Sequence, residues 1–255
     1  MVARREWTRQ QLLVAFALYC RLPFGRLHSR NPEIVQFAEA IGRTPSALAM
    51  KLSNIASLDP EITSTGRTGL TGASANDRAM WEEMHDDWER FAIESQQAIE
   101  TVRTIEESND EISQGRDDYP IGEDRAVEAT VRIGQSFFRS AVMSAYDGRC
   151  CITALSMPSL LVASHIVPWR HDKANRLNPR NGLLLSALHD KAFDSGLLTI
   201  NDDMTVRVSQ NHYEVGDEYF RQAILSYQGQ RIKLPEKFAP DPAFLSYHRE
   251  RIFQG

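Results

Sequence analysis

The stretch from Ala163 to Asp194 constrains the local fold more than any other part of the chain. It begins with a short apolar run rich in β-branched residues, and the interruption at Pro168 predicts a strand that ends at a turn. Gly182 and the three leucines after it predict a second short strand. Ser186 is a suitable helix N-cap, and the apolar residues that follow are spaced for one helix face. The stretch therefore predicts two strands followed by a helix.

Three side chains that can handle protons or metals occupy fixed places in this pattern. His165 lies in the first strand, Asn181 follows 16 residues later, and His189 follows Asn181 by eight residues, in the helix. One imidazole can take a proton from water near neutral pH, and a second can hold a cation. An amide can bond the loop backbone and orient the first ring. This set suits phosphodiester hydrolysis, which needs a deprotonated water and a cation at the phosphoryl oxygens.

Around these residues the chain resembles the HNH (ββα-metal) endonuclease family, in the form found in bacterial restriction-type proteins. The resemblance covers roughly Arg132 to Ile200, with the segments RIGQSFFRSAVMSAYDGRCCIT, ASHIVPWRHDKANRLNPRNGLLL and LHDKAFDSGLLTI. It implies that His165 is the general base and that Asn181 pins the catalytic loop. It also implies that His189 is a metal ligand.

One position departs from the family pattern. Where many members have Asp, Glu or His directly before the base, this chain has Ser164. A hydroxyl is a weak ligand, so we expect water, substrate phosphate or a carboxylate such as Asp194 to complete the metal site. Few protein ligands favour Mg²⁺ or Mn²⁺, which keep several waters, with Zn²⁺ as the alternative. Arg170 and Lys173 are candidates for DNA phosphate contacts, and a solvated loop is the alternative for both.

The N-terminal part predicts helices only. Asn31-Pro32 and Thr44-Pro45 are helix start signals, and Gly42 separates the two helices. This is a helix-turn-helix layout, and IVQFAEAIGRTPSALAMKLSNI resembles a Myb/SANT-like or related segment. In that layout four residues would face DNA: Arg43, Thr44, Ser46 and Lys51. The alternative is a small helical bundle that packs on the nuclease or mediates dimers.

Acidic residues are concentrated in one segment. Residues 85–127 hold 13 Asp and Glu against 4 Arg, a net charge of −9, whereas the whole chain carries −5. The first part has helical spacing, and residues 108–124 have the composition of a linker. We therefore expect an α+β protein with a helical DNA-binding domain at 1–84, an acidic helix and linker at 85–127, and an HNH nuclease domain at 128–255.

After the helix, two short runs around residues 201–203 predict a hairpin, and the segments at 218–226 and near the C-terminus predict helices. His212 and His248 are expected at the surface. No run of 18 apolar residues occurs, so no membrane span is expected, and the N-terminus lacks a signal-peptide core. Three cysteines make neither a disulfide framework nor a CxxC pair, which favours a cytoplasmic protein with reduced thiols.

Together these features predict a metal-dependent endonuclease of double-stranded DNA in restriction or phage defence. Since one HNH unit cuts one strand, double-strand cleavage would suggest a homodimer or sequential nicking, and a methyltransferase or defence protein is a conceivable partner. The alternatives are a DNA-binding regulator on a non-catalytic HNH scaffold, and a structure-specific or partner-guided nuclease.

Overall fold

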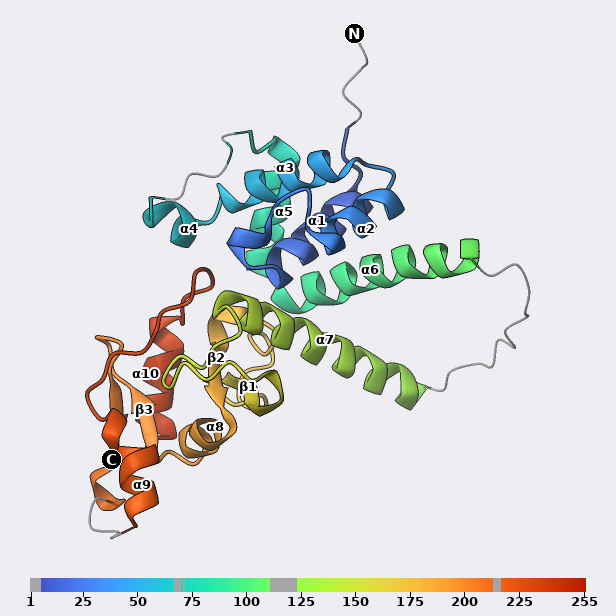
Figure 1. The fold of residues 1–255 in the computed structure, drawn as a ribbon. Helices are drawn as coiled ribbons and strands as arrows, with labels where there is room; N and C mark the ends of the chain where they lie inside the picture. Colours follow the sequence, from blue (N-terminus) through green and yellow to red (C-terminus); the bar gives the residue numbers. More distant parts are fainter. Residues whose placement is uncertain (1–5, 67–69, 71, 111–122, 213–216) are drawn as a thin grey trace. The chain divides into compact units, whose positions relative to one another are not determined.

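The computed structural model describes residues 6–66, 70, 72–110, 123–212 and 217–255, and it divides the chain into two compact units (Figure 1). The N-terminal unit, Met1–Phe137, is helical, and the C-terminal unit, Phe138–Gly255, combines small sheets with helices. The α+β class predicted from the sequence is confirmed. Within the described residues, no helix has both the length and the apolar composition needed to cross a membrane.

The N-terminal unit is built from short helices that begin where the sequence predicts. The Asn31 side chain accepts from the Glu33 N–H at one start, and the Thr44 hydroxyl accepts from the Ala47 N–H at the next. Gly42, at φ +64°, makes the turn between these helices. The helices are α1 Arg9–Arg21, α2 Pro32–Ala40, α3 Pro45–Ala56, α4 Pro60–Ser64, α5 Ala75–Asp86 and α6 Trp88–Asp110, with a 3-10 turn η1 at Phe24–Arg26.

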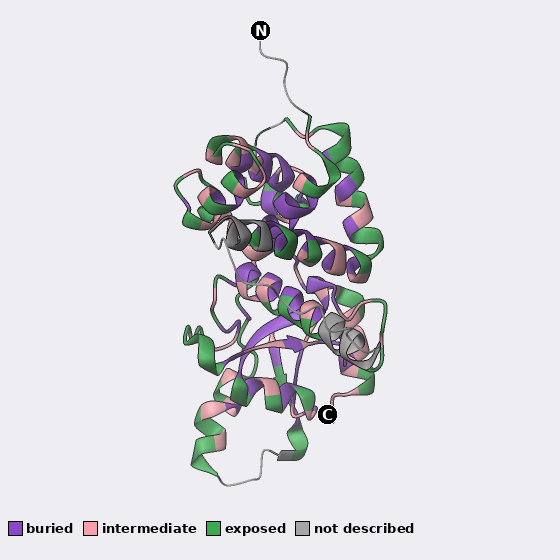
Figure 2. Cartoon of the chain, turned by 90° about the vertical axis from the view of Figure 1, so that its right-hand side faces the viewer, coloured by how far each residue is buried: buried purple, intermediate pink, exposed green. Residues whose placement is uncertain are grey.

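Helix α1 is the centre of this unit. Its residues from Leu12 to Cys20 are all buried, and it packs against α3 and α6. Figure 2 shows buried residues gathered where the helices of the unit face one another. The first part of the acidic segment is therefore a helix packed on α1. Its later part, residues 111–122, lies outside the described residues.

The C-terminal unit contains two separate antiparallel hairpins. Strand β1, Leu161–His165, pairs with β2, Gly182–Ser186, and β3, Leu198–Ile200, pairs with β4, Val206–Val208. Helix α8, Ala187–Asp194, follows β2 without a loop. The remaining elements are α7 Glu123–Ala145, which crosses the unit boundary, η2 Pro158–Leu160, η3 Pro179–Asn181, η4 Gln210–His212, α9 Glu218–Ala223, η5 Leu225–Tyr227 and α10 Pro242–Arg251. The predicted ββα order, the second hairpin and the two later helices are confirmed.

The prediction that His248 lies at the surface is wrong. The residue is buried, its ring stacks on Phe193 at 3.6 Å between centroids, and its nitrogens bond the Thr199 hydroxyl and the Phe193 carbonyl. Burial lowers the pKa of His248 to about 4, so the ring is neutral and ties α10 to β3 and α8. The ring can be buried because it packs as an aromatic side chain and both of its nitrogens have hydrogen-bond partners. The side chain of His212 lies outside the described part of the chain.

Lys51 also differs from its predicted position, because it lies inside the N-terminal unit. Its side chain is 7% exposed, and its Nζ donates to both carboxylate oxygens of Asp77, at 2.7 and 2.9 Å. Asp77 also accepts from the Ser74 N–H in the capping box that begins α5. Lys51 therefore joins α3 to α5, and its charge is matched within the protein.

Replacing Lys51 by Met should lower the free energy of unfolding by about 3–5 kcal/mol, because Asp77 would remain buried without its cation. Urea denaturation measures this change. Lys173→Met, at an exposed loop position, is the matched control and should change stability by no more than about 0.5 kcal/mol. Lys51→Met combined with Asp77→Asn should recover part of the loss. An unchanged stability in Lys51→Met would contradict the buried pair.

Candidate functional site

The site is organised by the ββα unit of β1, β2 and α8. In the β1–β2 register, His165 at the end of β1 lies opposite Gly182 at the start of β2. Ser186 ends β2 and at the same time caps α8, accepting from the His189 N–H at 3.4 Å. Because one residue ends the strand and begins the helix, the chain holds His165 and His189 on adjoining, rigid elements.

The ring of His165 is oriented by a backbone carbonyl. Its Nε2 lies 2.8 Å from the Arg176 carbonyl oxygen, which can only accept, so Nε2 carries the hydrogen. This leaves Nδ1 unprotonated, and it makes no hydrogen bond to the described residues. Burial lowers the pKa of His165 below its ordinary value, with the Arg176 carbonyl and the charge of Asp190 opposing part of the shift. The neutral ring with a free Nδ1 is the form that can accept a proton from water.

Aromatic rings fix this imidazole on two sides. Phe138 of α7 stacks on it, with 4.0 Å between centroids and 9° between planes, and Trp169 meets it edge-on at 5.3 Å. The close approach of α7 depends on Gly182, where a Cβ would lie 2.5 Å from Val142 Cγ2 and 3.0 Å from Phe138 Cζ. A glycine opposite His165 therefore makes room for the helix that supports the ring.

Asn181 closes the loop that follows His165. Its side-chain oxygen accepts from the Val167 N–H at 2.8 Å, and its nitrogen donates to the carbonyls of Val167 at 3.2 Å and Asn175 at 3.3 Å. Its own carbonyl accepts from the Ile166 N–H at 3.0 Å. Asn181 is buried, and through these bonds it holds the start of the loop and the stretch before Arg176 in fixed positions.

His189 is buried with one nitrogen bonded and one left over. Its Nδ1 lies 2.8 Å from the Ser186 hydroxyl, while Nε2 is buried and has no hydrogen-bond partner within the described part of the chain. Burial lowers the pKa of His189, and the nearby Ala223 carbonyl opposes part of that shift without a hydrogen bond to Nε2. With Nδ1–H donating to Ser186, Nε2 keeps a lone pair, as a metal-binding imidazole requires.

The metal donors expected from the sequence are few. The Ser164 hydroxyl is buried and, like His189 Nε2, makes no hydrogen bond to any residue that the structure describes. Asp194 lies at the exposed end of α8. Partial burial of its carboxylate and, as the smaller cause, repulsion from Asp190 raise its pKa. Among the described residues, no group of three or more His, Cys, Asp or Glu is placed to hold a metal. The donors present fit an ion that keeps most of its water.

The residues predicted to contact DNA fall into two groups. Arg170 and Lys173 are exposed in the loop after His165, and Thr44 and Ser46 are exposed at the start of α3. Arg43 is half-buried, donates to Gln11 Oε1 and lies over an indole ring, and Lys51 is buried. Arg43 and Lys51 therefore make contacts within the N-terminal unit. In the C-terminal unit, the predicted residues His165 and Asn181 lie in the same hydrogen-bonded loop region.

Three contributors to the site were not predicted: the Phe138 ring, the Arg176 carbonyl and the Asp190 charge. Phe138 lies within the quoted lead-in segment, but its pairing with His165 depends on how α7 packs, which spacing does not give. Asp190 is one helical turn before Asp194, so the i, i+4 spacing could have predicted that the two carboxylates lie close together. A backbone carbonyl leaves no residue-type signal at all.

Gly182→Ala tests the packing that supports His165. The added Cβ would force α7 away from the hairpin, so we expect about 1–3 kcal/mol of destabilisation and a rise in the His165 pKa as its burial is relieved. NMR titration of the histidine rings measures the pKa. Gly25→Ala is the control, since a Cβ there meets nothing within 4 Å. A His165 pKa that is the same in Gly182→Ala as in the parent chain would argue against this support.

Comparison with known families points to the same region. A family model described as HNH endonuclease matches residues 150–201, which include β1, β2, α8 and β3. No curated protein matches the chain. The match spans His165, Asn181 and His189 and indicates nuclease activity in general. Residues 150–201 are therefore similar to an HNH endonuclease domain.

Proposed function

We propose that the C-terminal unit is a metal-dependent DNA endonuclease in which His165 is the general base. The observation that carries this is the orientation of the His165 ring, whose Nε2–H is held by the Arg176 carbonyl while Nδ1 is free. The lowered pKa keeps the ring neutral near pH 7, so the base is ready before substrate binds.

In the proposed reaction, Nδ1 of His165 takes a proton from water, and the hydroxide formed attacks the phosphorus. The P–O bond to the leaving oxygen breaks, and that oxygen takes a proton from solvent. The imidazolium is stabilised by its Nε2–H bond to the Arg176 carbonyl and by the charge of Asp190. Asn181 keeps the Arg176 carbonyl and the ring in register by tying both ends of the loop.

His189 and Ser164 are the residues we propose for holding a divalent ion, because each presents a buried atom that lacks a hydrogen-bond partner. Asp194 is the carboxylate proposed alongside them. When bound, Mg²⁺ or Mn²⁺ would neutralise charge on the phosphoryl oxygens. One imidazole and one hydroxyl suit these ions better than Zn²⁺, which favours three or four protein ligands.

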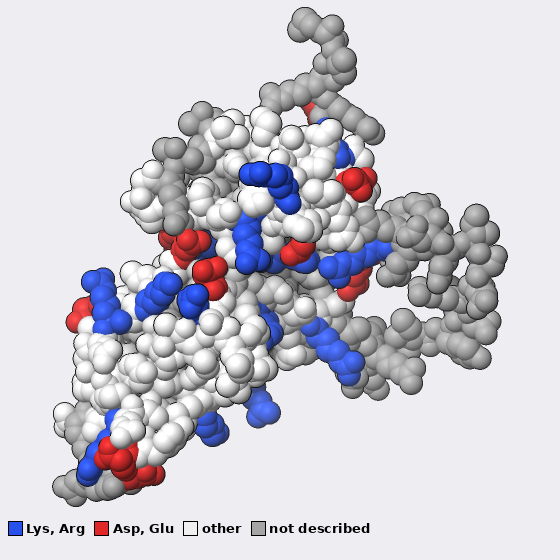
Figure 3. Space-filling model, viewed as in Figure 1, with Lys and Arg blue, Asp and Glu red and all other residues white. Residues whose placement is uncertain are grey.

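We further propose that the N-terminal unit recognises DNA and that the C-terminal unit cleaves it. Exposed Thr44 and Ser46 at the N-terminus of α3, and exposed Arg170 and Lys173 beside His165, support this assignment. Figure 3 shows Lys and Arg dispersed over the visible face of the C-terminal unit, with acidic side chains gathered at the end that carries α9. DNA would therefore approach away from that end.

A restriction or phage-defence role on double-stranded DNA in the cytoplasm is the biological setting we propose. Cleavage of both strands would then call for a dimer or for sequential nicking, and a methyltransferase would be a natural partner. The second candidate function is a DNA-binding regulator on a non-catalytic scaffold. The observation in its favour is Ser164, which stands where many family members have a stronger ligand.

His165→Ala should reduce cleavage of plasmid DNA in Mg²⁺ or Mn²⁺ by about 10²–10⁴-fold while DNA affinity stays nearly unchanged, because the base is lost and the phosphate contacts are kept. His171→Ala is the matched control, an exposed histidine in the same loop. EDTA should abolish cleavage by the parent chain. Full activity in His165→Ala would refute the proposed base, and DNA binding without any metal-dependent cleavage would favour the regulator.

A further inference from the structure

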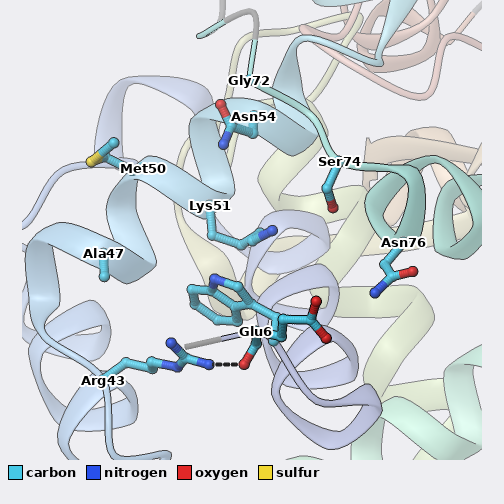
Figure 4. A pocket seen from close by; sticks show the side chains of 10 residues that line it. Glu6, Arg43, Ala47, Met50, Lys51, Asn54, Gly72, Ser74 and Asn76 are labelled. Carbon is cyan, nitrogen blue, oxygen red and sulfur yellow. Dashed lines mark hydrogen bonds between the residues drawn. The ribbon is translucent and has the colours of Figure 1, made fainter. Parts of the chain in front are cut away.

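The face of α3 that carries Lys51, one of the predicted DNA contacts, lines a cavity of about 570 Å³ within the N-terminal unit (Figure 4). Ala47, Met50, Lys51 and Asn54 come from one face of this helix, as their spacing of three and four residues requires. Ser74 and Asn76, from the start of α5, stand on the opposite wall. This face of α3 is therefore hollowed and can receive a group from outside.

Both cations of the cavity already have partners within the N-terminal unit, which argues against a phosphate ligand. Lys51 is bonded to both oxygens of Asp77. Arg43 donates to Gln11 Oε1 at 2.8 Å and to the Glu6 carbonyl, and its guanidinium lies 4.7 Å from the centre of the Trp7 ring. The hydrogen-bonding capacity left in the cavity comes from the Glu6 carboxylate, amides and a hydroxyl, which suits a polar ligand that donates hydrogen bonds and carries no negative charge.

Asn54 has an unsatisfied acceptor in this cavity. The residue is 7% exposed, and its Oδ1 is buried without a hydrogen-bond partner among the residues that the structure describes. A Cβ at Gly72 would come within 3.2 Å of that oxygen, so the glycine leaves the amide uncrowded, as Figure 4 shows. A buried acceptor without a partner is unfavourable and calls for a ligand that donates an N–H or O–H.

We propose that this cavity receives a nucleobase with an exocyclic amino group, adenine by preference, extruded from DNA. An asparagine amide can accept from the adenine amino group and donate to N7. Extruded bases are held between aromatic or apolar side chains. Here the half-exposed Met50 offers such surface, together with the part of Trp7 that Arg43 and Lys51 leave uncovered. The inference deepens the proposed function, since it assumes that the substrate is DNA.

The test measures binding without cleavage, using the full chain with His165→Ala in EDTA. Two duplexes are compared by fluorescence anisotropy, one with adenine opposite an abasic site and one with unsubstituted purine there, which lacks the amino group. We expect about tenfold tighter binding of the adenine duplex. Asn54→Leu removes the acceptor and Ala47→Phe fills the cavity, and each should abolish the preference. Ser64→Phe adds the same bulk at an exposed position of α4 and should leave it intact.

Equal affinity for the two duplexes in the chain with intact Asn54 overturns the proposal, as does a preference that survives both Asn54→Leu and Ala47→Phe. Circular dichroism checks that the variants fold. If Asn54→Leu does not fold, Ala47→Phe alone tests whether the preference depends on the cavity. Free adenosine provides the second arm. If it binds in an Asn54-dependent manner while the duplexes bind alike, the ligand is a free nucleoside and the extrusion proposal is wrong. None of these results depends on cleavage, so the role of His165 is judged separately.

Discussion

The bonds of the Asn181 side chain to the loop after β1 are the constraint on which the candidate site depends. The β1–β2 hairpin alone would fix the Cα of His165, but not the direction of its ring. Because Asn181 holds Val167 at the start of the loop and Asn175 near its end, the Arg176 carbonyl is kept where the His165 Nε2–H can reach it. The direction of the ring and its tautomer then depend on one buried amide, whereas the lowered pKa of His165 comes mainly from burial.

Packing from outside the ββα unit completes this arrangement. Phe138 lies flat on the imidazole, and the lack of a side chain at Gly182 lets α7 come close enough for that contact. The ring is thereby shielded from water on one face, which disfavours its charged form. The orientation and pKa of His165 thus depend in part on Phe138, an apolar side chain that takes no part in the reaction. Phe138 lies on α7, a helix that precedes the region matched by the family model.

Much of the site could be predicted from sequence because its signals are local. Ser186 caps α8, and Asn31 and Thr44 cap α2 and α3, through contacts between neighbours in the chain. The apolar, β-branched run around His165 likewise predicts the strand β1. These contacts depend on residue type and spacing, which a sequence displays.

The remaining features depend on long-range packing, which no local pattern contains. The sequence around Lys51 is typical of a surface position, and its burial depends on the contact with Asp77, 26 residues away. The burial of His248 likewise depends on the packing of α10 against Phe193. Helices α5 and α7 were not foreseen either. The sequence between Gly66 and Ser74 predicts only a loop, and the charged start of α7 reads as the end of a linker.

The most direct test of the account is the protonation state of the His165 ring, read from long-range proton–nitrogen NMR correlations of the histidines at pH 7. We expect a neutral imidazole with the hydrogen on Nε2 and an unprotonated Nδ1, and the signals of this ring are assigned by their loss in His165→Ala. A ring protonated on Nδ1, or on both nitrogens at that pH, would contradict it, because no lone pair would then be available to take a proton from water.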